Sequence, residues 1–242
     1  MIQFGMGKLV GIRNDVDNGT PRCFGEVQDA SIEASFTEKD LKGRKQFAID
    51  VARAGGKITG KAKTATIRGG VFSDIFFGVD AETGGILLVE NEAGTIPAST
   101  AYTVTVANTA HFRTDLGVTD LQGNPYKLVT GTPTTGQYAV SSAGVYTFAE
   151  ADAGESVLMS YLYTSTSGYT FEVTNQKMGA APTFQLILSN EYRDKTLTVI
   201  LNKCASTKLS MPFKNEDHTI TEFDFSAMAD DSGGIGTWSF SE

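Results

Sequence analysis

The chain has 242 residues, a formal net charge of −8, 40 % hydrophobic residues and 20 % charged residues. This composition excludes a disordered chain and a membrane-embedded one. The acidic excess argues against ordinary binding to duplex DNA, where Lys and Arg must contact phosphates. Cys23 and Cys204 are the only cysteines, too few for a disulfide framework.

The charge is unevenly distributed along the chain. Residues 1–68 hold 12 basic and 8 acidic side chains, so the acidic excess lies entirely in the remainder. The first residues, Met1–Gly11, lack the apolar core of a signal peptide. We therefore expect synthesis in the cytoplasm.

The first predicted elements are two strands joined by a charged loop. Residues 24–37 alternate between an apolar face and a polar one, the pattern of a half-buried strand. A second strand is expected at 46–53, with Phe47, Ile49 and Val51 inside. The loop between them, Glu38–Lys45, is rich in basic residues.

A single helix is predicted next. Residues 66–77 place Val71, Phe72, Ile75 and Phe76 on one stripe, and Gly78 would end the helix. The remaining chain indicates short strands punctuated by turn residues. We expect them at 86–90, 102–107, 136–140, 144–148, 156–163, 169–173, 183–189, 196–202, 219–227 and 235–240, with a charged turn at 190–195.

These elements predict a mainly β protein, either a β-sandwich or a barrel, with one flanking helix. No linker or repeat interrupts the sequence, so residues 1–242 are expected to form a single domain. Within it, residues 79–183 form a β-rich central segment or insertion whose placement stays open.

The motifs that suggest catalysis have better explanations. The sequence from Asp231 to Gly234, together with Thr109–His111, is similar to the boxes of a serine protease. However, only 10 residues follow Ser232, and Asp230 would repel a developing oxyanion. A turn before the last strand accounts for this segment. We expect no enzyme, no catalytic residue, no cofactor and no metal site.

The polar face of the first strand allows two interpretations. It is either an ordinary solvated sheet face or the wall of a water-filled channel, since large barrels line their lumen with the polar side of each strand. The residues concerned are Asp29, Ser31, Glu33 and Ser35, with Asp50 on the next strand.

The C-terminal region carries a resemblance to a known family. The pattern Lys-Leu-Ser-x-Pro from Lys208, then Glu216-Asp217, then Phe223-Asp224-Phe225, then Gly234-Ile235-Gly236 resembles the end of a tail tube protein of long-tailed, double-stranded DNA bacteriophages. Similar stretches occur at Gly5–Gly11, Ala34–Ile49 and Gly136–Tyr163. The family is related to the tube proteins of type VI secretion systems.

The resemblance implies a structural protein of the virion tail, made and assembled in the host bacterial cytoplasm. Its subunits would form stacked hexameric rings, in which inner sheets join into a closed barrel. The expected partners are further copies of the chain, a tape-measure protein, tail tip or baseplate proteins, a tail terminator and, in contractile tails, a sheath. Double-stranded DNA would pass without specific binding, and no membrane is involved.

The resemblance also suggests roles for the charged residues. The wall residues Asp29, Ser31, Glu33, Ser35 and Asp50 would face the lumen, where they would repel or ignore phosphates. The basic group would contact an acidic patch on the next ring. These two groups are Lys39, Lys42, Arg44 and Lys45, and Glu216, Asp217, Glu222 and Asp224.

Two alternatives remain open, one for the basic loop and one for the function of the whole chain. The basic loop could simply be solvated, since exposed ion pairs are individually weak. The chain as a whole could instead be a phage fibre or decoration module that binds a host glycan.

Overall fold

The computed structural model describes residues 5–66 and 68–241. The fold is mainly β, as predicted, and its contacts divide it into two units. Unit 1 comprises residues 1–81 and 171–242, and unit 2 comprises 82–170. No helix among the described residues is long and apolar enough to cross a membrane.

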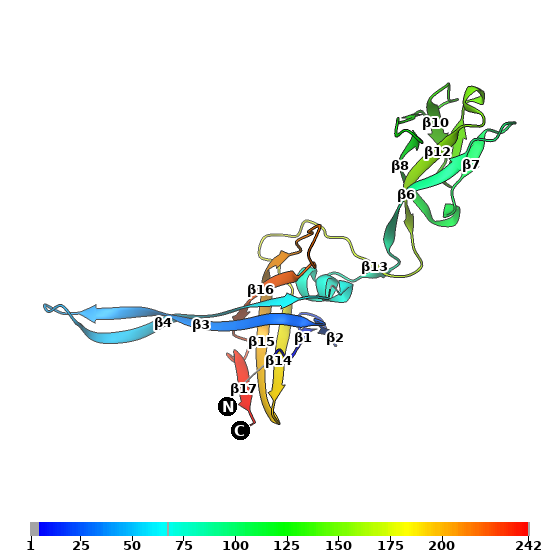
Figure 1. The fold of residues 1–242 in the computed structure, drawn as a ribbon. Coiled ribbons are helices and arrows are strands. Elements are labelled where there is room, and N and C mark those ends of the chain that lie inside the picture. The colour runs from blue at the N-terminus through cyan, green and yellow to red at the C-terminus, as the bar shows by residue number, and fades with distance from the viewer. Residues whose placement is uncertain (1–4, 67, 242) are drawn as a thin grey trace. The chain divides into compact units, whose positions relative to one another are not determined.

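Unit 1 is built on one eight-stranded sheet (Figure 1). Its main path runs β2-β1-β14-β15-β16-β4-β3, and β17 pairs with the start of β15. The strands are β1 (Lys8–Arg13), β2 (Pro21–Cys23), β3 (Val27–Lys42), β4 (Ala48–Thr64), β14 (Thr183–Tyr192), β15 (Lys195–Ser210), β16 (Thr221–Met228) and β17 (Gly236–Phe240).

This sheet is strongly curled. In a flat sheet β2 and β3, at opposite ends of the path, would lie about 29 Å apart, six strand spacings. Only residues 24–26 join them, so the Cα atoms of Cys23 and Val27 are at most about 15 Å apart. The concave side holds the core, where the ring of Phe24 stacks on that of Phe223 with 4.6 Å between centroids.

A short helix, η1 (Val71–Phe77), covers part of this core. It is a π-helix and starts later than the predicted 66–77, of which residue 67 lies outside the described residues. Val71 and Ile75 are buried, and Gly78 ends the helix in the left-handed conformation, as expected. The Arg22 Nε donates to Asp74 Oδ2 at 2.5 Å, which ties the helix to β2.

The turn between β14 and β15 is tighter than predicted. Arg193 and Asp194 both have positive φ, 52° and 60°, while Tyr192 pairs with Lys195. A two-residue turn of this kind fits the right-handed twist of a hairpin. The two strands therefore extend into the charged segment 190–195.

β16 and β17 lie one after the other along the same side of β15. Both run antiparallel to β15, first along its second half and then along its first half. Residues 229–235 leave the sheet between them, and the bonds Asp230 N–H to Gly234 O and Asn202 N–H to Ile235 O close this excursion. The predicted turn before the last strand is therefore confirmed.

Two sheets of unit 2 share one core, and a third consists of two short strands. The larger sheet runs β7-β11-β10-β9 and the smaller β6-β12-β8, while β5 pairs with β13 where the chain enters and leaves the unit. The strands are β5 (Glu82–Thr83), β6 (Ile86–Thr95), β7 (Thr103–Thr105), β8 (Phe112–Asp120), β9 (Lys127–Leu128), β10 (Gln137–Val140), β11 (Val145–Phe148), β12 (Ser156–Thr164) and β13 (Tyr169–Thr170). Single 3-10 turns occur at η2 (Thr109–His111) and η3 (Glu150–Asp152).

A carboxylate orders the core of unit 2. Asp115 accepts hydrogen bonds from the hydroxyls of Tyr138, at 2.6 Å, and Tyr146, at 2.8 Å. Burial, together with these bonds, raises the pKa of both tyrosines. The two rings stack on each other with 5.8 Å between centroids.

Candidate assembly surfaces

The longest surface feature of unit 1 is the hairpin of β3 and β4 (Figure 1). Its base belongs to the sheet, because Ile58–Thr64 pair with β16. Beyond Ile58, β4 is paired only with β3 among the described residues. We call residues 36–57 the distal hairpin.

The distal hairpin corrects two predictions. Glu38–Lys42 are not loop but the end of β3, so only residues 43–47 form the connection. Phe47 and Ile49, expected inside, are 85 % and 72 % exposed, and Val51 is also exposed. The reason is that the hairpin runs past the sheet, where none of the described residues forms a second layer over it.

Apolar side chains are therefore left in water along this segment. Phe36, Leu41, Phe47, Ile49 and Val51 are all more than half exposed. The Arg53 guanidinium lies over the Phe36 ring, 4.8 Å from its centroid. A two-stranded ribbon is marginally stable by itself in water, so this arrangement favours a covering partner.

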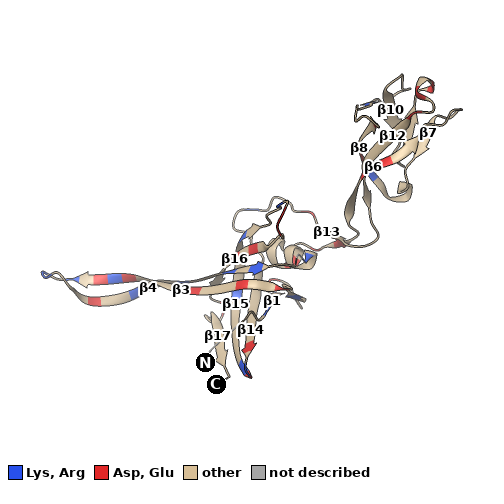
Figure 2. Cartoon of the chain, in the orientation of Figure 1, with Lys and Arg blue, Asp and Glu red and all other residues tan. Residues whose placement is uncertain are grey.

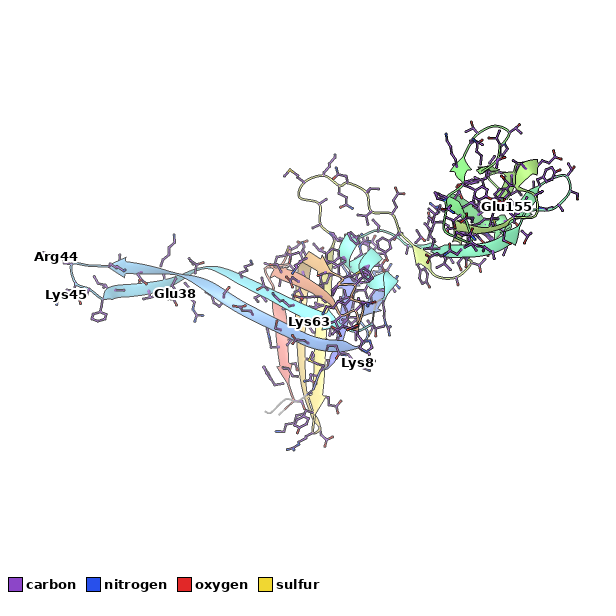
Figure 3. All side chains as sticks on the ribbon, turned by 45° about the horizontal axis from the view of Figure 1, so that its top comes forward. Lys8, Glu38, Arg44, Lys45, Lys63 and Glu155 are labelled. Carbon is purple, nitrogen blue, oxygen red and sulfur yellow. The ribbon has the colours of Figure 1, made fainter. Side chains whose placement is uncertain are left out.

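The predicted basic group lies on the same distal hairpin. Lys39 and Lys42 belong to β3, and Arg44 and Lys45 lie at the tip (Figure 3). All four are exposed. Lys42 has a weak ion pair with Asp40 at 4.0 Å, and acidic residues alternate with the basic ones along the ribbon (Figure 2).

The proposed wall residues fall into two places. Asp29, Ser31, Glu33 and Ser35 lie along one exposed face of β3, because they pair in steps of two with β4. Asp50 is not beside them: it pairs with Leu41 in the distal hairpin, about 20 Å farther along the strand than Ser35.

Three lysines share the exposed face with these residues. Lys63 pairs with Asp29, Lys61 with Ser31 and Lys57 with Ser35. The sequence indicates that these lysines share a face, because Lys57, Lys61 and Lys63 are separated by even numbers of residues along one strand. Their partners depend on register and could not be read from the sequence.

The predicted acidic group is also divided by the structure. Glu222 and Asp224 belong to β16 and are opposite Lys63 and Lys61, so they lie on the same face of the sheet, where both are half-buried. Glu216 and Asp217 lie instead in the loop after β15. There Asp217 accepts a 2.9 Å bond from Lys214, which lowers the pKa of Asp217.

The exposed face thus has columns of alternating charge. Lys63 of β4 lies between Asp29 of β3 and Glu222 of β16, and Lys61 lies beside Asp224 of β16. Lys208 of β15 occupies the position opposite Asp224 on its other side. Four carboxylates and four ammonium groups balance here: Asp29, Glu33, Glu222 and Asp224 against Lys57, Lys61, Lys63 and Lys208. The face is polar but not acidic.

The segment Asp231–Gly234, which is similar to a serine-protease motif, forms a hydrogen-bonded turn with Asp230. Asp230 accepts bonds from Ser232 Oγ at 2.7 Å, Asn202 Nδ2 at 2.7 Å and Gly234 N–H at 2.8 Å. These bonds lower the pKa of Asp230 to about 2. The Ser232 hydroxyl is thereby held by a neighbouring carboxylate of the same turn.

Comparison with protein-family models and with curated proteins found no match for this chain.

Proposed function

We propose that this chain is the structural subunit of a phage tail tube, in which hexameric rings stack into a hollow conduit. The observation that carries the proposal is the distal hairpin, a long two-stranded ribbon with large apolar side chains in water. Such a ribbon gains stability when a second surface covers it. In a stack of identical rings, the adjacent copies supply that surface.

The free strand edges of unit 1 support lateral joining. The outer edge of β3, over 16 residues, is unpaired among the described residues, and so is the outer edge of β17. Exposed edges of this length invite aggregation unless they are covered or closed. A heterologous contact that closes after six copies would remove them and join the sheets into one inner barrel.

The exposed face of β3, β4 and β16 is the proposed lumen wall. Its hydroxyls and balanced charges offer a passing polyanion little net attraction or repulsion. Specific phosphate binding needs unopposed basic side chains, whereas each of Lys61 and Lys63 lies beside a carboxylate. We therefore propose a polar, charge-balanced lumen in place of an acidic one.

The tip of the hairpin is the proposed contact between rings. Lys42 and Arg44 would meet acidic side chains of the next ring, with Glu216 and Asp217 as the accessible candidates. The double variant Lys42→Glu/Arg44→Glu should then slow or abolish tube growth. Arg193→Glu/Lys195→Glu, at the other charged turn of unit 1, is the matched control and should polymerise normally.

The remaining partners follow from the same proposal. A tape-measure protein would fill the tube before DNA does, and tip, baseplate and terminator proteins would bound its length. Localisation would be the virion tail after assembly in the host bacterial cytoplasm. A sheath would surround the tube only in a contractile tail.

Electron microscopy tests the proposal directly. Purified protein, with and without tail-tip complexes to nucleate growth, should give rings or tubes, and antibodies should label the shaft of native particles. Labelling outside any hollow shaft would refute the proposal. Binding of the soluble protein to host glycans, combined with such labelling, would favour the fibre or decoration module.

A further inference from the structure

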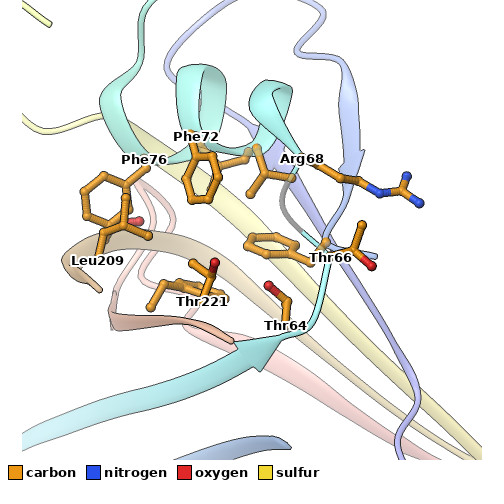
Figure 4. A pocket seen from close by; sticks show the side chains of 12 residues that line it. Thr64, Thr66, Arg68, Phe72, Phe76, Leu209 and Thr221 are labelled. Atoms are coloured by element: carbon orange, nitrogen blue, oxygen red, sulfur yellow. The ribbon is translucent and has the colours of Figure 1, made fainter. Parts of the chain in front are cut away.

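A small cavity lies between helix η1 and the sheet of unit 1 (Figure 4). Its walls are mostly apolar, and its volume is about 20 Å³. The apolar lining residues include Phe24, Val71, Phe72, Ile75, Phe76, Leu209 and Phe223.

Polar groups also line this cavity. Thr64 of β4 and Thr221 of β16 are directly opposite each other in the sheet, and they are only 5 % and 3 % exposed. Both direct their hydroxyls into the space beneath Phe72 (Figure 4). The Thr221 Oγ1 has no hydrogen-bond partner among the described residues.

An unpartnered buried hydroxyl destabilises the folded state, because it has lost its hydrogen bonds to water, so a partner is expected. The volume decides which kind of partner fits. One water needs about 10–15 Å³, whereas the apolar cavity that admits benzene measures about 150 Å³. The cavity at Thr221 therefore fits a water and excludes an organic ligand.

The position of this water follows from the cross-strand pairing of Thr64 with Thr221. Side chains directly opposite in an antiparallel pair have Cβ atoms about 4.5–5.5 Å apart, which one water can bridge. Ser206 Oγ is also unpartnered and lines the same cavity, but it lies too far along the sheet for one water to reach both it and Thr221. It pairs with Phe225, about 13 Å along β16 from Thr221.

We infer that unit 1 contains a specific internal water site, in which one ordered water bridges the hydroxyls of Thr64 and Thr221 beneath helix η1. The water links β4 to β16 at the point where β4 leaves the sheet for the helix. This inference does not depend on the proposed function of the protein.

Replacement of each threonine by valine tests the inference, because the two possibilities predict opposite signs. With a bridging water, Thr64→Val and Thr221→Val each shift the unfolding equilibrium about two- to tenfold toward the unfolded state. The double variant then loses less than the sum, since both hydroxyls hold the same water. In a dry cavity, Thr221→Val removes an unpartnered hydroxyl and stabilises the protein.

Unit 1 itself supplies a fluorescence readout of unfolding and a control variant for this test. Trp238 is the only tryptophan, and it lies in β17, so its fluorescence follows the unfolding of unit 1 in the full chain. Thr66→Val is the matched control, because Thr66 lines the cavity but directs its hydroxyl away from it (Figure 4). A crystal structure of the full chain should show a solvent peak between Thr64 and Thr221. Absence of that peak, or stabilisation by Thr221→Val, overturns the inference.

Discussion

Asp29 of β3 and Lys63 of β4 occupy directly opposite positions on the exposed face of the unit 1 sheet. Glu222 of β16 flanks the same lysine on its other side. Cross-strand pairs of opposite charge stabilise a sheet by about 0.2–1 kcal/mol each, and like charges destabilise it. A lysine between two carboxylates therefore separates charges that would otherwise repel.

Reversal of this central charge should destabilise unit 1. Lys63→Glu would place three carboxylates in one row, so we expect the free energy of unfolding to fall by about 1 kcal/mol. The loss should shrink in 1 M salt, where the screening length is about 3 Å. Denaturation followed by Trp238 fluorescence measures both effects. Lys39→Glu, opposite Ala52, is the control and should change little.

Removal of the Asp115 carboxylate should destabilise unit 2. Asp115→Ala would leave the hydroxyls of Tyr138 and Tyr146 without their acceptor inside the core. We expect a loss of about 3 kcal/mol, because hydrogen bonds to charged groups contribute about 1.5–3 kcal/mol each. Chemical denaturation followed by tyrosine circular dichroism tests this. Tyr138→Phe removes only one of the two hydrogen bonds, so its loss of stability should be smaller than that of Asp115→Ala. An equal loss would contradict the role of Asp115 as the shared acceptor.

The same tyrosines predict a dependence on alkaline pH. Their pKa values are raised in the folded state from the ordinary value of 10.0, chiefly by burial. A raised pKa contributes stability that is complete below pH 10 and is lost as pH rises toward the folded value. Unit 2 should therefore weaken above pH 10. The pKa values of Tyr126 and Tyr161 in the same unit are raised as well. Absorbance of tyrosinate should therefore show a group of tyrosines, Tyr138 and Tyr146 among them, that ionise only as unit 2 unfolds, and free titration of Tyr138 and Tyr146 in the folded chain would contradict this.

The Asp230 turn should hold β17 in place. Asp230→Ala removes the acceptor for Ser232, Asn202 and Gly234, so the 229–235 excursion should loosen. Faster amide exchange in β17 and a shifted Trp238 emission are expected. Because the pKa of Asp230 is depressed to about 2, its contribution is present above pH 3.8 and is lost as pH falls through 2. Unchanged exchange in β17 would show that the turn closes without the carboxylate.

Unit 2 should be removable from the chain. Thr83 and Tyr169, beside the points where the chain enters and leaves, are directly opposite each other in β5 and β13. Their Cα atoms are therefore about 5 Å apart, a gap that a short Gly-Ser link can close. A variant that lacks residues 84–168 should keep the Trp238 emission and cooperative unfolding of unit 1. Loss of both would show that unit 1 depends on the insertion.

Several elements could be predicted because their signals are local. The alternation of residues 29–35 predicts the polar face of β3, and Gly78 predicts the end of the helix. Other elements gave weaker signals. β8 (Phe112–Asp120) was missed, since its register shifts around Ser160 and Leu162 of β12 break the regular pattern. β1 (Lys8–Arg13) was missed as well.

The exposed face and the distal hairpin show where local patterns fail. Phe47 and Ile49 have the spacing of an inward face, yet both are exposed, because no described part of the chain packs over them. Likewise, the polar face of β3 carries Asp29 and Glu33 in the sequence, but Lys61 and Lys63 of β4 join that face in the sheet. Burial and charge balance both depend on neighbours that are distant in sequence.

The sequence by itself determined that the protein is mainly β, which face of β3 is polar, and that a turn precedes the last strand, because alternation and turn chemistry act over a few residues. The tertiary structure alone decided that the chain has two units, that β16 and β17 share one line along β15, and that lysines of β4 neutralise the polar face. These features follow from which strands are paired and from the register of each pair. A shift of one residue in the register of a strand would move its side chains to the opposite face of the sheet.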